Sequence, residues 1–219
     1  MPSAISANAR WLHALKDRLA ASGRGADNKA QARGTLEAAG YTWNGDGMLE
    51  TSEGERVQIN YRYADGSDDR TTMADLVQYN LADIGIEVEL KPFAVADLGT
   101  TLSNSDFDMV NYGWTSQPLV VSSATQWWTS GSSSNFGKND DPELDVLLEK
   151  LSSESDTDKA ADIANQAVQR VIEDAYVLPT VDIPVAVMIN EDFVNVRDNW
   201  ASQQRALYNI AEWGLRADN

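Results

Sequence analysis

The sequence predicts an α/β fold, because two strand-like segments enclose a helical one. Residues 56–64 (RVQINYRYA) and 86–93 (IEVELKPF) alternate apolar and polar side chains with the period of two that is typical of strands. Residues 68–84 between them carry apolar side chains at helical spacing and end at Gly85. Strand, helix and strand within about thirty residues predict a βαβ unit with a parallel strand pair and a right-handed crossover.

Two further helices are predicted before this unit. Residues 6–21 place four apolar side chains on one helical face. Residues 27–39 form the second helix, where Asp27 or Asn28 can cap the start and Gly40 can take the left-handed conformation after the end. The apolar residues of the first helix are Trp11, Leu12, Leu15 and Leu19.

A long polar loop, residues 115–140, is the main feature after the βαβ unit. It is rich in Ser, Thr, Gly and Asn but contains Trp127, Trp128 and Phe136. Polar loops with embedded aromatic residues often cover or bind a ligand or another surface.

The remaining predicted elements lie on both sides of this loop. A short helix is predicted at 94–102 and a strand at 106–114. After the loop, helices are predicted at 142–151, with Pro142 after an Asp cap, and at 156–174. One or two strands at 175–189, interrupted by Pro179 and Pro184, precede an irregular end anchored by Trp200, Tyr208 and Trp213.

The composition restricts the classes of partner. The net charge is −17 in 219 residues, which argues against nucleic acid or an anionic membrane surface, since both require clustered Lys and Arg. The chain has no cysteine, so disulfides and thiolate chemistry are excluded. No apolar run approaches the roughly 20 residues that span a bilayer. The first residues lack the basic and apolar regions of a signal peptide, so an export signal is expected outside this chain.

Residues 40–55 (GYTWNGDGMLETSEGE) have a spacing similar to that of an EF-hand calcium loop. Thr42 stands where such a loop normally has its first carboxylate, and a strand follows where the motif needs a helix. We therefore expect that Asn44 to Gly47 form a tight turn in which the glycines supply positive φ angles, and that no metal is bound.

Candidate catalytic residues are few. His13 is the only histidine, and no nucleophile or phosphate-binding motif occurs. The pairs Asp106/Asp108 and Asp140/Asp141 could serve as acid and base in a carboxylate-dependent hydrolase. Most carboxylates of an acidic protein are solvated or cap helices, however, so we expect no enzyme and no cofactor.

A binding site is favoured at residues 111–118 (NYGWTSQP), where an aromatic strand end precedes a polar loop. Ligands of open α/β sheets gather beyond the carboxyl ends of the strands. Trp114 offers a flat apolar surface there, and Thr115, Ser116 and Gln117 offer hydrogen-bonding groups. Trp114 could equally be a core residue at the strand end. A second alternative makes the tryptophan-rich loop, residues 123–136, a protein-docking surface with Trp127 and Trp128 exposed on a flat face.

Taken together, the motifs resemble the C-terminal part of the family 5 solute-binding proteins, which are the peptide, nickel and sugar-binding components of ABC importers. The resemblance covers about residues 27–190 and follows the family's order. The matching segments are NKAQARGTLEAAGYTWNGDGML, a helix ending in Ala-Gly-Tyr before an Asp-Gly turn; VQINYRYADGSDDRTTMADLVQYNLADIGIEVELKPF, with its Gly-Ile-x-Val strand; FDMVNYGW; SSSNFGKNDDPELDVLL; and AVQRVIEDAYVLPTVDIP.

This resemblance implies a periplasmic-binding-protein type II-like C-terminal lobe with a mixed sheet flanked by helices. Residues 1–178 would form that lobe, incomplete on its N-terminal side, and residues 179–219 a tail that crosses back toward the first lobe. The N-terminal lobe would be missing, so the chain alone would bind ligand weakly or not at all. An exposed tail would then pack on this lobe or on another copy, giving a homo-oligomer.

The resemblance also implies a function and a set of site residues. The full protein would close around a peptide or another small polar solute and deliver it to a membrane permease, outside the cytoplasm, either membrane-anchored or secreted. Trp114 would face the cleft, Thr115 would make a backbone contact, and Asn135 would lie near the cleft. Peptide-binding members hold the peptide's α-amino group with an Asp soon after the Gly-Trp pair. Here no acid follows Trp114 until Asp140, which argues against an anchor for a free amine.

Overall fold

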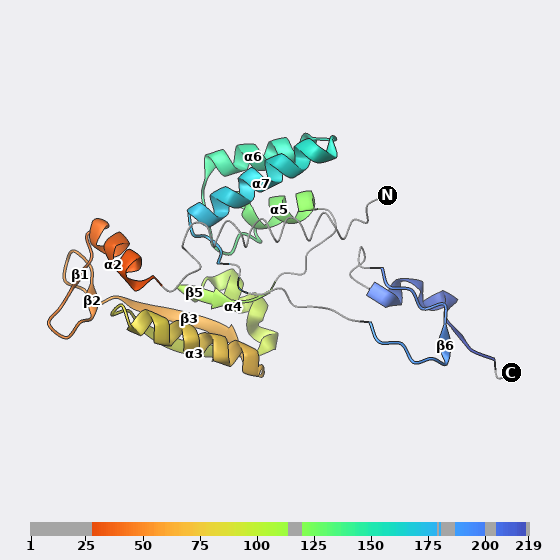
Figure 1. Cartoon of the computed structure of the whole chain (residues 1–219), viewed down its shortest axis with the longest axis horizontal. Helices are drawn as coiled ribbons and strands as arrows, with labels where there is room; N and C mark the ends of the chain where they lie inside the picture. Colours follow the sequence, from red (N-terminus) through yellow and green to blue (C-terminus); the bar gives the residue numbers. More distant parts are fainter. Residues whose placement is uncertain (1–27, 114–119, 179, 181–186, 200–204, 218–219) are drawn as a thin grey trace. The chain divides into compact units, whose positions relative to one another are not determined.

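The computed structural model describes residues 28–113, 120–178, 180, 187–199 and 205–217. The chain divides into two compact units, Met1–Gly113 and Trp114–Asn219. We call residues 28–113 the sheet unit, residues 120–178 the helical unit and residues 187–217 the tail (Figure 1). The helix predicted at residues 6–21, most of the strand region predicted around Pro184, and the anchor Trp200 lie outside the described residues.

A parallel three-stranded sheet forms the centre of the sheet unit. Its strands are β3 (Gln58–Ala64), β4 (Glu87–Phe93) and β5 (Met109–Asn111), in the order β4-β3-β5. Tyr61 of β3 lies opposite Leu90 of β4 and Met109 of β5. The helix α3 (Asp68–Ala82) connects β3 to β4, so the predicted βαβ unit and the α/β class are confirmed. The strands β3, β4 and β5 of this sheet are all parallel, whereas a mixed sheet was expected.

One face of this sheet packs against α3, which lies along β3 in Figure 1. The alternation of the sequence explains the packing, because every second residue of a strand points to the same face. Gln78 of α3 donates from Nε2 to the carbonyl of Val88 in the outer strand β4 (2.8 Å). The buried residues of this core are Leu49, Tyr61, Tyr63, Ala74, Ile84, Ile86 and Val88.

The strand β5 is shorter than the nine residues predicted. At its start, the Asp108 carboxylate accepts a hydrogen bond from the N–H of Asn60 (2.7 Å), while the N–H of Asp108 donates to the carbonyl of Asn60 (3.0 Å). The Asp108 side chain thus takes the place of one backbone acceptor just before Met109, while the backbone bond from Asp108 to Asn60 is kept. A short turn, η1 (Val95–Asp97), and the helix α4 (Leu98–Asn104) precede the strand, which confirms the short helix predicted at 94–102.

The helix α2 (Lys29–Ala38) begins and ends as its sequence predicts. The Asn28 side chain accepts from the N–H of Gln31 (3.0 Å) and caps the start. Gly40 has a φ of +91°, and the N–H of Tyr41 donates to the carbonyl of Leu36 (3.0 Å). Such a reversal satisfies the carbonyl groups at the end of a helix and favours glycine at this position.

The stretch with EF-hand-like spacing is a β-hairpin. The strands β1 (Thr42–Trp43) and β2 (Leu49–Glu50) pair in antiparallel orientation. The Asn44 side-chain oxygen accepts from the N–H groups of Asp46 and Met48, both at 3.0 Å. The predicted turn is therefore confirmed, but only Gly47 of its two glycines has a positive φ (+79°), whereas both were expected to. The side-chain oxygen that would serve as a calcium ligand accepts hydrogen bonds from the turn's own backbone.

The hairpin packs closely on the turn between α3 and β4. The indole N–H of Trp43 donates to the carbonyl of Ile84 (2.6 Å), and the N–H of Leu49 donates to the carbonyl of Gly85 (2.7 Å). Gly85 has a φ of +86°, and a Cβ atom there would lie 2.3 Å from the carbonyl oxygen of Gly47. Only glycine fits this approach.

Three helices make up the helical unit: α5 (Val120–Trp128), α6 (Pro142–Ser153) and α7 (Thr157–Glu173). The second and third were predicted, including Asp141 as the cap before Pro142. The first corrects the expectation of an uninterrupted polar loop from residue 115 to residue 140. The buried core consists of Ala124, Leu144, Leu148, Leu151, Ala164, Ala167 and Val171.

The tail contains more regular structure than the sequence indicated. The strands β6 (Phe193–Val194) and β7 (Gly214–Leu215) pair in antiparallel orientation, and η2 (Arg205–Glu212) is helical with a kink at Asn209. The described residues of the region from 175 to 189 are not in strands, so the strand prediction fails for those residues.

Candidate functional site

Four of the predicted site residues follow the carboxyl end of β5 in the sequence. Asn111, the last residue of β5, donates from Nδ2 to the sulfur of Met73 on α3 (2.9 Å). Its side chain also hydrogen-bonds to Tyr61; burial raises the pKa of Tyr61, and the bond to Asn111 opposes that rise. The strand end is thereby fixed to the helix and to the core. The predicted ligand residues, Trp114, Thr115, Ser116 and Gln117, follow in the sequence and fall outside the described residues.

The loop from residue 129 to residue 141, between α5 and α6 of the helical unit, contains the other predicted site residue. Asn135 is buried in this loop. Its side-chain nitrogen donates to the carbonyl of Asn139 (2.9 Å) and to the carbonyl of Thr129 (3.3 Å). The side-chain nitrogen of Asn139 in turn donates to the carbonyl of Trp128 (3.0 Å). Asn135 therefore holds the loop in shape, because its donor groups bind the loop's own backbone.

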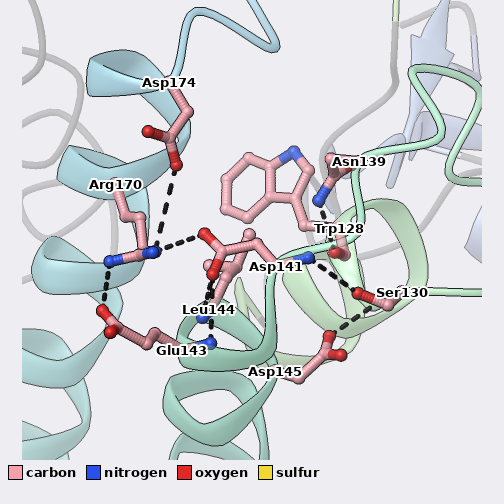
Figure 2. Close-up of polar contacts among 9 residues, drawn as sticks. All are labelled: Trp128, Ser130, Asn139, Asp141, Glu143, Leu144, Asp145, Arg170 and Asp174. Atoms are coloured by element: carbon pink, nitrogen blue, oxygen red, sulfur yellow. Dashed lines mark hydrogen bonds and ion pairs between the residues drawn. The ribbon is translucent and has the colours of Figure 1, made fainter.

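The ends of this loop are joined by a second group of polar contacts, drawn in Figure 2. The N–H of Asp141 donates to the hydroxyl of Ser130 (3.1 Å), and the N–H of Ser130 donates to the carboxylate of Asp145 (2.8 Å). These bonds connect the end of α5 to the first turn of α6. The loop is thus tied both internally and at its base.

Asp141 is the centre of this group. One carboxylate oxygen accepts from the N–H groups of Glu143 (3.0 Å) and Leu144 (3.2 Å), which caps α6. The other binds Nε of Arg170 on α7, whose Nη1 also binds Glu143 (2.5 Å; Figure 2). The hydrogen bond from Arg170 holds the pKa of Asp141 below its ordinary value; burial opposes this, and the two N–H donors add to it.

The paired carboxylates considered for catalysis have structural contacts. Asp106 forms an ion pair with Arg62 (2.5 Å), and Asp108 binds the backbone of Asn60. Asp141 caps α6, and its neighbour Asp140 is exposed. In the described part of the chain, no group of three His, Asp or Glu side chains could hold a metal ion. The local chemistry is that of hydrogen bonding and aromatic contact.

The tryptophans of α5 do not lie on an open flat face. Trp127 and Trp128 contact each other edge to face, with ring centroids 6.4 Å apart. Both are partly buried, and Trp128 packs against the core of the helical unit. The expectation that both are exposed for protein docking is therefore wrong.

Two features of the site were missed from the sequence. The helix α5 had a signal, since Val120, Val121, Ala124, Trp127 and Trp128 follow helical spacing. The contact between Arg170 and Asp141 joins residues far apart in the sequence and had no local signal.

Comparison with known proteins gives a family and a fold. The model of the family described as "Bacterial extracellular solute-binding proteins, family 5 Middle" matches residues 4–136. The oligopeptide-binding protein OppA of Mycobacterium tuberculosis (strain ATCC 25618 / H37Rv) is 30% identical over 175 residues, which is 80% of this chain and 29% of OppA. The chain thus spans less than a third of the length of this curated relative.

Solved structures of binding proteins have a similar fold. The periplasmic EDTA-binding protein EppA has a TM-score of 0.77 and 25% identity, covering 86% of this chain and 35% of that one. The oligopeptide-binding protein AppA of Bacillus subtilis, in complex with a nonapeptide, has a TM-score of 0.67 and 23% identity, covering 87% and 38%. The expected binding-protein architecture is confirmed by these likenesses.

Proposed function

Because the chain belongs to family 5 of the bacterial extracellular solute-binding proteins, we propose that it supplies one lobe of the substrate-binding component of an ABC-type importer. The complete protein captures a peptide or similar small polar solute between two lobes and delivers it to a membrane permease. Residues 1–178 contribute most of the second lobe, and residues 179–219 cross back to the first. Closure follows because a solute that touches both lobes binds the closed state more tightly.

The observation that carries this proposal is the fixed carboxyl end of β5. Parallel strands direct their carboxyl ends to one edge of the sheet, where ligands of such folds bind. Asn111 secures that end through Met73 and Tyr61. The chain then continues into one aromatic residue and three polar ones, Trp114 to Gln117.

Each proposed site residue has a distinct role. Trp114 supplies an aromatic surface, Thr115 a backbone hydrogen bond, and Ser116 and Gln117 side-chain hydrogen bonds. Asn135 contributes by holding the shape of the loop from residue 129 to residue 141, since its amide donates to the carbonyls of Thr129 and Asn139. We expect its replacement to weaken solute binding through the loop.

The solute class follows from the missing acid. No carboxylate occurs between Trp114 and Asp140, so the stretch after the Gly-Trp pair offers no acid to hold a peptide's charged amine. We therefore propose that it accepts solutes with a blocked or absent amine, such as N-acetylated peptides, as well as it accepts free peptides.

The solute is captured outside the cytoplasm, as in the family's description, by a protein that is secreted or anchored to the membrane. Over the described residues, no helix has both the length and the apolar character needed to cross a bilayer.

Calorimetry and thermal unfolding test the function. The longer protein that contains both lobes is titrated with free peptides, N-acetylated peptides, oligosaccharides and metal complexes, and the 219-residue chain is run in parallel. We expect one solute class to stabilise the longer protein, by about 2.7 kcal/mol at 100 times its dissociation constant, and to leave the chain unchanged. Equal stabilisation of the chain alone would contradict an interlobe site.

Tryptophan variants of the longer protein separate this site from the docking-surface alternative. Trp114→Ala should weaken solute binding at least tenfold, on the scale of a lost aromatic contact, whereas Trp127→Ala should leave it within twofold. Melting temperatures identify any variant that fails to fold. An equal loss for both variants would show that Trp114 has no special contact with the solute.

A further inference from the structure

Arg62 of β3 is a charged side chain that is largely buried in the sheet unit. Its neighbours in the strand, Tyr61 and Tyr63, belong to the core that also contains Ala74 of α3. Because successive residues of a strand point to opposite faces, Arg62 lies on the face away from α3. Its side chain is nevertheless only 16% exposed. Arginine is rarely buried unless it has a partner, so its contacts indicate what it does there.

Arg62 joins β3 to segments on both sides of it. Its Nη1 atom binds the carboxylate of Asp106 (2.5 Å), a residue between α4 and β5. Its guanidinium carbon lies 5.8 Å from the ring centroid of Phe93, the last residue of β4. One side chain of the central strand thus contacts both the end of β4 and the segment that enters β5.

The strand β5 is short and lies at the edge of the sheet. It has three residues, and in the described part of the chain it pairs with β3 alone. Two carboxylates hold the segment before it. Asp108 binds the backbone of Asn60, and Asp106 binds Arg62. Three residues of a strand span only about 10 Å, so a change where β5 begins reaches Asn111, where it ends.

Stability alone does not favour arginine at this position. The Nε atom of Arg62 is buried and has no hydrogen-bond partner among the described residues, and a buried donor without a partner destabilises a fold. Asp106 is 60% exposed, so its ion pair adds little to global stability. An apolar side chain of similar size would suit the fold about as well. These observations favour a role for Arg62 other than folding.

We propose that Arg62 is a positioning residue for the solute site. By binding Asp106 it sets where β5 begins, and hence where the carboxyl end of β5 directs the chain into Trp114 and the three polar residues after it. The inference rests on the function proposed above, because it assigns Arg62 to the site at the end of β5. Arg62 acts through Asp106 and β5 and does not touch the solute.

The sheet contains a matched control, Lys91 of β4. Lys91 lies directly opposite Arg62 in the strand register and therefore on the same face of the sheet. Its ion pair is with Glu89 of its own strand (2.8 Å). Lys91 thus offers a cation in the same surroundings, with an ion pair that stays within β4.

Hydrogen exchange on the full 219-residue chain tests whether Arg62 positions β5. Arg62→Met removes the charge from a side chain of similar length, and Asp106→Ala removes the same ion pair from its exposed partner. We expect each variant to lower the protection of the amides of Met109–Asn111 by about fivefold, on the scale of one ion pair, and to leave that of β4 within about twofold. Lys91→Met should leave the protection of β5 within about twofold.

Solute affinity of the longer protein that contains both lobes tests the role in the site, with the free and N-acetylated peptides of the calorimetric test. Arg62→Met should weaken binding by about fivefold with the midpoint of urea unfolding unchanged. Arg62→Lys keeps the charge and should recover most of the affinity. A residue with only a structural role would lower the midpoint and the affinity together.

Three results would overturn the inference. The first is unchanged protection of β5 in both Arg62→Met and Asp106→Ala. The second is a longer protein in which Arg62→Met binds peptide as tightly as the wild type does. The third is a loss of affinity that a lower unfolding midpoint accompanies. If the wild-type longer protein bound neither class of peptide while β5 lost protection in Arg62→Met, the proposed function would fail, and Arg62 would still position β5.

Discussion

The hairpin turn of the sheet unit and the α5–α6 loop of the helical unit are each held by one asparagine side chain. The two side chains have opposite hydrogen-bonding roles, because one accepts and the other donates. Asn44 uses its side-chain oxygen to accept from two backbone N–H groups. Asn135 uses its side-chain nitrogen to donate to two backbone carbonyls. The same residue type thus mimics a carbonyl in one turn and an N–H group in the other. Aspartate can replace the first role and cannot replace the second.

The largest effect is expected at the hairpin's docking point. Gly85→Ala should lower the free energy of unfolding by about 3 kcal/mol or more, because a positive φ and a clash with Gly47 act together. Urea denaturation measures the loss. Gly45→Ala is the matched control, since nothing lies within 4 Å of its added Cβ, and it should be nearly neutral. Similar losses for both would mean that the hairpin is not held by its approach to Gly85.

The next largest loss of stability is expected when the donor group of Asn135 is removed. Asn135→Asp should cost about 2–3 kcal/mol, because a buried carboxylate would face two carbonyl oxygens and leave both without a donor. Denaturation combined with hydrogen exchange should place the loss in α5 and α6. A change below about 0.5 kcal/mol would show that the loop does not depend on this amide.

Removal of the charged contact at the loop's base should have a somewhat smaller effect. Asp141→Ala should cost about 2 kcal/mol, since both the cap of α6 and the bond to Arg170 are lost. Asp140→Ala is the control, because this neighbouring carboxylate is exposed and should be close to neutral. Equal stabilities for the two variants would exclude Asp141 as the support of the loop.

Asp141 also predicts a pH dependence. Its folded pKa lies below the ordinary value of 3.8, so the folded state holds this proton less tightly than the unfolded state does. The resulting stabilisation is present above pH 3.8 and is lost as pH falls below that value toward the folded pKa. The stability difference between wild type and Asp141→Asn should therefore shrink as pH falls through this range. A constant difference would show that the carboxylate is not ionised preferentially in the fold.

The smallest effect sharpens the comparison. Asn44→Asp keeps both accepted N–H bonds, but it loses the donation from Nδ2 to Glu50 (2.8 Å) and places two carboxylates against each other there, so it should cost about 1 kcal/mol. Urea denaturation of this variant beside Asn135→Asp compares the same chemical change in both turns. If Asn44→Asp and Asn135→Asp lowered the free energy of unfolding equally, stability would not depend on whether the asparagine accepts or donates hydrogen bonds.

Regular periodicity explains what could be predicted from the sequence. The βαβ unit alternates with a period of two on both sides of a helical stretch, and α6 has its Asp-Pro start, so these elements follow from local pattern. The helix α5 was obscured by the Ser- and Thr-rich composition around its apolar residues. The strands β6 and β7 have two residues each, which is too short for any period to show.

The candidate site was less predictable, because its contacts are not local. Asn135 could be located in a polar loop, but the direction of its hydrogen bonds depends on where Thr129 and Asn139 lie in space. Arg170 meets Asp141 only because α7 packs beside α6 (Figure 2). Sequence patterns identify a turn-forming residue, and the fold decides which of its atoms act.

Pro92 makes the outer edge of β4 a poor partner for a further strand. The N–H of Glu87 and the carbonyl of Phe93 both point toward the β3 side, so by alternation the nitrogen of Pro92 points to the outer edge of β4, where it has no hydrogen to donate. Gln78 already occupies the carbonyl of Val88 on that edge. A strand supplied from elsewhere would therefore find fewer backbone partners along the outer edge of β4 than an unblocked edge offers.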